Sequence, residues 1–198
     1  QTLKYSLGLG LVELSTTALS SIELYEVSRP VLEELNAETG ETVFLMVLDR
    51  GEGVYIRKID SRQKLAIRSE VGRREPAHAS AVGKALLAYL PEAEVEEIVA
   101  RVGLPKMTEN TITDLATLKA HLAEVRRRGF AIDNEEGELG IRCIGAPIFD
   151  HRGHPVASVS ISAPASRVSL EQLLGWSDLL LSGARRISHQ LGYRQPQP

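Results

Sequence analysis

The stretch Asn134–Asp150, NEEGELGIRCIGAPIFD, contains the only cysteine of the chain, Cys143. Arg142 is its immediate neighbour, and the residues before it are acidic: Glu135, Glu136 and Glu138. A lone thiol could act as a nucleophile, bind a metal ion, or form part of the wall of a binding pocket. These alternatives imply an enzyme, a metalloprotein and a ligand sensor.

A nucleophilic cysteine needs a general base and an electropositive setting that favours the thiolate. The glutamates near Cys143 disfavour a thiolate, and strand alternation directs Arg142 to the opposite face. A metal site formed by Cys143, His78 and Asp133 is conceivable, but no ligand spacing supports it. His151 and His154 belong to an expected turn and should be solvated. We therefore predict no catalytic residue, no metal ligand and no cofactor.

Two glycine-containing motifs do not meet the requirements of nucleotide sites. Residues 8–13, GLGLVE, have Glu13 where a dinucleotide fingerprint needs its third glycine. Gly83 and Lys84 occur as in a phosphate loop, but His78 replaces the leading glycine and Ala85 replaces the Ser or Thr that would bind magnesium. His78, which precedes an expected helix, is left with either a structural or capping role or a role in contacting a ligand.

The composition predicts one globular domain, alone or with an appendage. The chain has 198 residues, 43% of them hydrophobic, and carries a net charge of −3. One cysteine permits no internal disulfide, which suits the reducing cytoplasm, and no apolar run is long enough to span a membrane. The three arginines Arg126–Arg128 end an expected helix, where they oppose the macrodipole. We therefore expect a cytoplasmic protein that does not bind DNA tightly by itself.

Hydrophobic periodicity predicts helices alternating with β-hairpins. Helices are expected at 15–41 (kinked or restarted at Pro30), 80–90, 91–103, 115–128 and 169–191. Strands are expected at 42–49, 53–59, 65–71, 130–134, 141–150 and 155–163. Hairpins separated by helices indicate an α+β domain with an antiparallel sheet flanked by helices.

Alternation along the last hairpin places small polar side chains on one face. With an even loop centred between His151 and Arg152, Cys143 would lie opposite Ser160 and Ile141 opposite Ser162. This face could be the floor of a cavity that offers weak donors to a small polar ligand. Alternatively, its small side chains let a helix pack closely, and the hydroxyls bond locally.

Several segments, in order along nearly the whole chain, resemble the effector-binding domain of IclR-family transcriptional regulators. They are YSLGLGLVEL, RPVLEELNAETGETVFLMVLDRGEGVYI, HASAVGKALLAYLP, NTITDLATLKAHLAEVRRRGFAIDNEE, GIRCIGAPIFD and VASVSIS. The resemblance implies a GAF/PAS-like fold whose pocket holds a small organic or aromatic acid. The residues that it and the hairpin analysis assign to ligand binding are Leu65, Ile67, His78, Ala81, Val82, Asp133, Ile141, Cys143, Ser160 and Ser162.

We accordingly expect a linker helix over 1–20, an effector-binding domain over 21–193 and a disordered tail over 194–198. The family carries an N-terminal winged helix-turn-helix that has no counterpart here. The chain is therefore expected either to be a fragment of a longer regulator, which its abrupt start favours, or to regulate without touching DNA. The expected partners are the acid effector, further copies in a homodimer or homotetramer, and operator DNA bound only through the missing domain. The alternatives are a metal-dependent sensor that uses Cys143 and a GAF-like thiol enzyme.

Overall fold

The computed structural model describes residues 10, 14, 23–65, 67 and 69–194. The predicted linker helix 1–20 and tail 194–198 lie outside this part, apart from Gly10, Leu14 and Arg194. No helix of the described part is long and apolar enough to cross a membrane.

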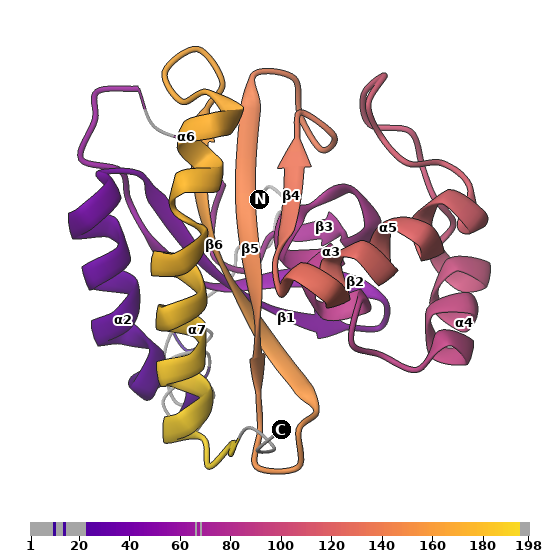
Figure 1. Cartoon of the computed structure of the whole chain (residues 1–198), viewed down its shortest axis with the longest axis horizontal. Coiled ribbons are helices and arrows are strands. Elements are labelled where there is room, and N and C mark those ends of the chain that lie inside the picture. The colour runs from indigo at the N-terminus through magenta and orange to yellow at the C-terminus, as the bar shows by residue number, and fades with distance from the viewer. Residues whose placement is uncertain (1–9, 11–13, 15–22, 66, 68, 195–198) are drawn as a thin grey trace, which may run out of the picture.

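The described chain folds as an antiparallel sheet with helices on both faces, which confirms the predicted α+β class (Figure 1). The strands are β1 (Thr42–Asp49), β2 (Glu52–Ile59), β3 (Arg74–Pro76), β4 (Ala131–Asn134), β5 (Ile141–Phe149) and β6 (Pro155–Pro164). Their order across the sheet is β3-β2-β1-β6-β5-β4. The helices are α2 (Glu23–Thr39), the short 3-10 turn η1 (Ala77–Ala79), α3 (Ala81–Leu87), α4 (Glu92–Val102), α5 (Leu115–Arg128), α6 (Leu170–Gly175) and α7 (Ser177–Gln190).

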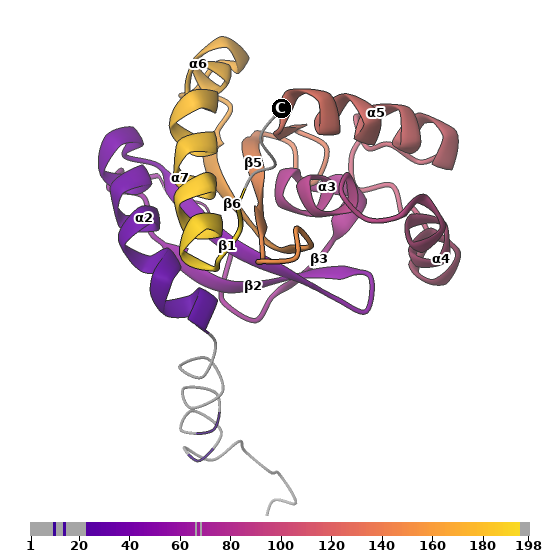
Figure 2. The same ribbon diagram turned by 60° about the horizontal axis from the view of Figure 1, so that its bottom comes forward.

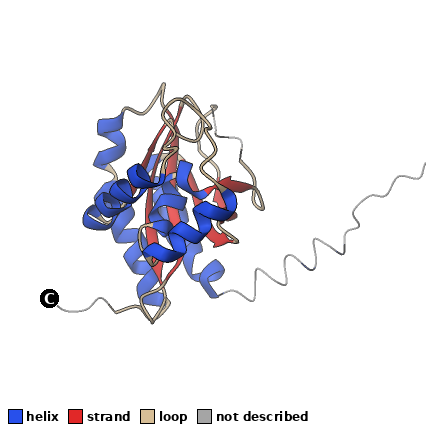
Figure 3. Ribbon diagram, turned by 90° about the vertical axis from the view of Figure 1, so that its right-hand side faces the viewer, coloured by secondary structure: helices blue, strands red, loops and turns tan. Residues whose placement is uncertain are grey.

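The sheet separates two groups of helices. Helices α2, α6 and α7 cover one face, whereas α3, α4 and α5 lie on the other side (Figures 1 and 2). The first face buries the largest core, in which odd-numbered residues of β1 meet Ile144 and Ile161. The second face carries a core of α3, α4 and α5 side chains and a smaller cluster around Phe44. Figure 3 shows this second group of helices in front of the strands.

Local signals fix several boundaries. Asp114 caps α5 by accepting a hydrogen bond from Thr117 N at 2.8 Å, and Gly129 ends the helix at a left-handed φ of 87°. Arg50 and Gly51 both have positive φ, as a two-residue hairpin turn between β1 and β2 requires. The capping box predicted at Ser169 and Gln172 opens α6.

Helix α2 continues through Pro30 instead of restarting there, because its buried face offsets the loss of one backbone hydrogen bond; the alternative of a kink at this residue stays a prediction. Two other predictions about elements were wrong. In the stretch 65–71 no described residue is in a strand; β2 pairs instead with Arg74–Pro76. The predicted helix 169–191 is two helices that are interrupted at Trp176, whose backbone leaves the helical region.

The predicted register of the last hairpin was also wrong, by two residues. Cys143 pairs with Ser162, Gly145 with Ser160 and Ile141 with Pro164. The loop is odd in length, and an irregularity between Ile148 and Phe149 adds a residue to the second strand. Because the shift is even, each side chain keeps the face that alternation had assigned to it.

Candidate functional site

The face of the sheet towards α3 carries polar residues in a row across four strands. Asp133 of β4 pairs with Cys143 of β5, Cys143 with Ser162 of β6, and Ser162 with Thr42 of β1. In the next row Gly145 pairs with Ser160, and Ser160 with Phe44. Residues opposite each other in antiparallel strands have neighbouring side chains. Three consecutive strands and the distant β1 thus build one polar surface.

Helix α3 packs over this surface through two small residues. A Cβ on Gly145 would lie 2.8 Å from the carbonyl carbon of Ala81, so only glycine permits this approach. Ser158 Oγ donates a hydrogen bond to Val82 O at 2.8 Å and ties the helix to β6. Ser80 caps α3 by accepting from Gly83 N at 3.1 Å. The first turn of α3 is therefore held against the sheet.

A cavity of about 70 Å³ lies between the sheet and α3. Eight of the predicted ligand-binding residues line it: Ile67, Ala81, Val82, Asp133, Ile141, Cys143, Ser160 and Ser162. Its other walls come from Phe44, Tyr55, Ser69, Arg73, Glu75, Ser80, Met107, Gly137 and Glu138. The lining residues together come from all six strands, from α3 and from the intervening loops, which no local sequence pattern brings together.

Two predicted residues lie away from the cavity. The side chain of Leu65 is 58% exposed and lines no part of it. His78 is buried, and its Nε2 lies 3.1 Å from Pro105 O. Of the two roles left open for His78, this contact corresponds to a structural one.

The Cys143 thiol faces the cavity in a setting that keeps it protonated. Burial and the neighbouring Asp133 raise its pKa well above the ordinary value, and a hydrogen bond with Ser162 and the charge of Lys84 offset this only in part. A thiol held neutral is a poor nucleophile. The described residues contain no group of three His, Cys, Asp or Glu side chains able to hold a metal ion.

Asp133 is a buried carboxyl group that organises the loop between β4 and β5. Its Oδ1 accepts hydrogen bonds from Glu136 N at 2.7 Å and Gly137 N at 3.3 Å. Burial is the main cause that raises its pKa to about 7, against the opposing effects of Lys84 and these backbone donors.

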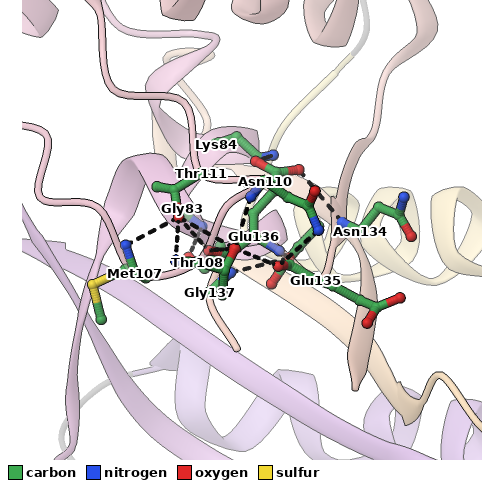
Figure 4. Close-up of polar contacts among 12 residues, drawn as sticks. Gly83, Lys84, Met107, Thr108, Asn110, Thr111, Asn134, Glu135, Glu136 and Gly137 are labelled. Carbon is green, nitrogen blue, oxygen red and sulfur yellow. Dashed lines mark hydrogen bonds and ion pairs between the residues drawn. The ribbon is translucent and has the colours of Figure 1, made fainter. Parts of the chain in front are cut away.

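The buried ion pair Lys84–Glu136 is a feature that the sequence analysis missed. Lys84 of α3 is fully buried and donates to Glu136 Oε2 in the β4–β5 loop (Figure 4). The same loop accepts hydrogen bonds from two threonines: Thr108 Oγ1 donates to Glu135 O, and Thr111 Oγ1 to Glu136 O, both at 2.7 Å. The loop that contributes Gly137 and Glu138 to the cavity is thereby fixed to α3 and to the segment before α5.

One buried hydroxyl in the cavity has no partner within the described part of the chain. Ser69 Oγ lines the cavity and makes no hydrogen bond there. Ser69, Ile67 and Arg73 also line a broad surface groove, so they stand between the cavity and that groove. Buried hydroxyls ordinarily find partners, which makes Ser69 suited to bind a polar ligand.

Comparisons with known proteins agree on one family. Its model, described as "Bacterial transcriptional regulator IclR C-terminal", matches residues 16–189. The HTH-type transcriptional regulator KdgR of Escherichia coli is 43% identical over 190 residues, which cover 96% of this chain and 72% of that protein. The chain spans 62% of the length of the KdgR of Dickeya chrysanthemi.

Two solved structures are informative. The Thermotoga maritima IclR superposes with a TM-score of 0.89 at 41% identity, covering 96% of this chain and 76% of that one. The inducer-binding domain of an Acinetobacter PobR double mutant, solved as a complex with 3-hydroxybenzoic acid, superposes with a TM-score of 0.76 at 29% identity. That match covers 82% of this chain and 96% of the PobR chain.

Proposed function

The chain belongs to the IclR family of bacterial transcriptional regulators, and we propose that the cavity beside Cys143 is the pocket in which this domain senses a small organic acid. The family predicted from the sequence is thereby confirmed. Because its relatives are transcriptional regulators, the chain is not an enzyme, which also confirms the prediction made from its residues.

The observation that carries the proposal is the composition of the cavity walls. Ser160 and Ser162 are 1% and 3% exposed, and their hydroxyls lie 3.4 Å apart, too long for a strong mutual hydrogen bond. Ser160 is therefore suited to donate to a carboxylate or a carbonyl oxygen, as is Ser162, whose hydroxyl also contacts the Cys143 thiol. The backbone N–H groups of Ala81 and Val82, in the first turn of α3, add further donors. Ile67 and Ile141 supply apolar contacts.

The size of the cavity supports a ligand at the small end of this class. A volume of about 70 Å³ accommodates only a few non-hydrogen atoms. The PobR neighbour binds an aromatic acid in its own inducer-binding domain. We propose that the effector here is a small aliphatic acid.

Effector binding regulates only if it favours one state of the regulator over another. We propose that the ligand shifts the arrangement of subunits in a homodimer or homotetramer, and that a helix-turn-helix of the intact regulator then changes its affinity for operator DNA. Light scattering during gel filtration, with and without effector, measures the assembly. An effector that changes neither assembly nor operator affinity would contradict this coupling.

Thermal denaturation with a panel of small aliphatic and aromatic acids tests the pocket, because a ligand that binds only the folded state raises its stability. Calorimetry then compares the best acid on three variants. Ser160→Ala and Cys143→Trp should weaken binding while leaving the fold intact. Ser182→Ala, the same truncation at an exposed residue of α7, should leave the affinity unchanged. Unchanged affinity in both cavity variants would overturn the assignment.

A further inference from the structure

The ionisable side chains that line the cavity are mostly acidic. The described lining contains the carboxyl groups of Glu75, Asp133 and Glu138, whereas Arg73 is its one cation. Arg73 Nε already pairs with Glu75 Oε1 at 2.9 Å. Glu138 is exposed, so solvent screens its charge, whereas Asp133 is buried. An organic acid brings a further negative charge, and charges repel strongly where water is excluded. An ionised Asp133 therefore opposes the binding of an anion in this cavity.

Lys84 does not supply the missing positive charge. Its ammonium group is fully buried, does not line the cavity, and is paired with Glu136 (Figure 4). Lys84, Glu136 and Asp133 together carry one negative charge when both carboxyl groups are ionised. They carry none when Asp133 is protonated, so a proton on Asp133 removes the repulsion without moving the ion pair.

The geometry of Asp133 leaves one oxygen available for that proton. Oδ1 accepts hydrogen bonds from the backbone N–H groups of Glu136 and Gly137. Oδ1 is therefore the oxygen that carries no proton. Oδ2 makes no hydrogen bond with the described residues, and it lies beside Gly137, itself part of the cavity wall. A proton on Oδ2 would therefore be positioned to make a hydrogen bond to a ligand.

The other ionisable groups around Asp133 are either kept neutral by burial or already paired with another residue. Burial raises the pKa of both Tyr55 on β2 and Cys143 on β5, so both remain neutral. Burial raises the pKa of Glu75 on β3, while Arg73 opposes the rise. His78, on η1, lies against Pro105. Asp133 itself, with a pKa of about 7, is the group that changes charge near neutral pH.

We propose that Asp133 determines ligand specificity by binding an organic acid together with one proton, so that Oδ2 donates a hydrogen bond to a carboxylate oxygen of the ligand. This inference rests on the proposed acid-sensing function and specifies its chemistry. The ligand must present an acceptor to Asp133, and an acid should bind more tightly as the pH falls. A neutral amide of the same shape carries no negative charge, so its binding does not require a proton on Asp133.

The experiment measures the affinity of pyruvate and 3-hydroxybenzoate, with their neutral amides as controls, between pH 6.0 and pH 8.5. If only the form with protonated Asp133 binds the acid, the affinity should fall about 30-fold over this range. Calorimetry at pH 8 in buffers of different protonation enthalpy should detect the uptake of about one proton per acid bound. The amides should show neither effect.

Two variants separate Asp133 from its neighbours. Asp133→Asn keeps an acceptor oxygen and cannot ionise, so the acid should bind with no pH dependence and no proton uptake. Glu138→Gln, at another carboxylate of the same wall, should keep both. Equal affinity of the wild type at pH 6.0 and pH 8.5, or a pH dependence that persists in Asp133→Asn, would overturn this inference alone. Failure of every acid to bind at pH 6.0 would overturn the acid-sensing proposal as well.

Discussion

Replacing Lys84 by Met tests whether the buried ion pair holds the wall of the cavity. The substitution keeps most of the apolar stem and removes the charge, which leaves Glu136 and Asp133 buried without their cation. Removing one partner of a buried pair costs about 3–5 kcal/mol, because the remaining charge loses its compensation. For a domain of this size, the melting temperature should fall by roughly 6–20 °C. Urea unfolding followed by circular dichroism measures the free energy directly.

The double variant Lys84→Met/Glu136→Gln provides the decisive comparison. Replacing both charges of a buried pair is often nearly neutral, so the second substitution should recover most of the loss. Lys119→Met, which removes a surface lysine paired with Glu92 and Glu96, should change stability little. If Lys84→Met lowers the free energy of unfolding by less than about 1 kcal/mol, the ion pair does not hold the β4–β5 loop in place.

Three further predictions follow from the same region. Gly145→Ala should lower the free energy of unfolding in urea by about 1–3 kcal/mol, because the new Cβ would meet the backbone of α3. Gly175→Ala is the control, since a Cβ there would have no neighbouring atom within 4 Å and should not destabilise the domain. Ser158→Ala should cost about 1–3 kcal/mol in the same assay, because the buried Val82 O loses its donor. Since burial raises the pKa of Asp133 to about 7, wild-type stability should fall by up to about 1.4 kcal/mol per unit as the pH rises from 4.5 to 7. Urea titrations of Asp133→Asn should lack this fall; an equal slope in both proteins would contradict it.

Features set by neighbouring residues could be predicted from the sequence. Helix α5 begins and ends where Asp114 and Gly129 indicated, because a cap and a left-handed glycine act within one turn. The polar face of β5 and β6 was assigned correctly by alternation. Its register was wrong because the irregularity beside Phe149 depends on how the hairpin packs, and residue types do not reveal it.

Interactions between distant segments could not be predicted in this way. Lys84 was considered only as part of a failed phosphate loop, since its partner Glu136 lies 52 residues further along the chain. A lysine in an otherwise apolar helix, AVGKALL, was the one available signal that a buried carboxylate should be sought. The strand predicted at 65–71 was wrong for a similar reason. Apolar residues there face the cavity or solvent, and the edge of the sheet is formed by β3, which pairs with the distant β2.

The pairing of β1 with β6 has a consequence for folding kinetics. It joins Thr42 to Ser162, so the middle of the sheet closes only after nearly all of the domain has been synthesised. Contacts between residues so far apart form slowly, because the loop entropy is lost before the contact is gained. The surface that carries Ser160 and Ser162 depends on this step. A ligand there should therefore slow unfolding more than it speeds folding, and only a completed domain can report the presence of its effector.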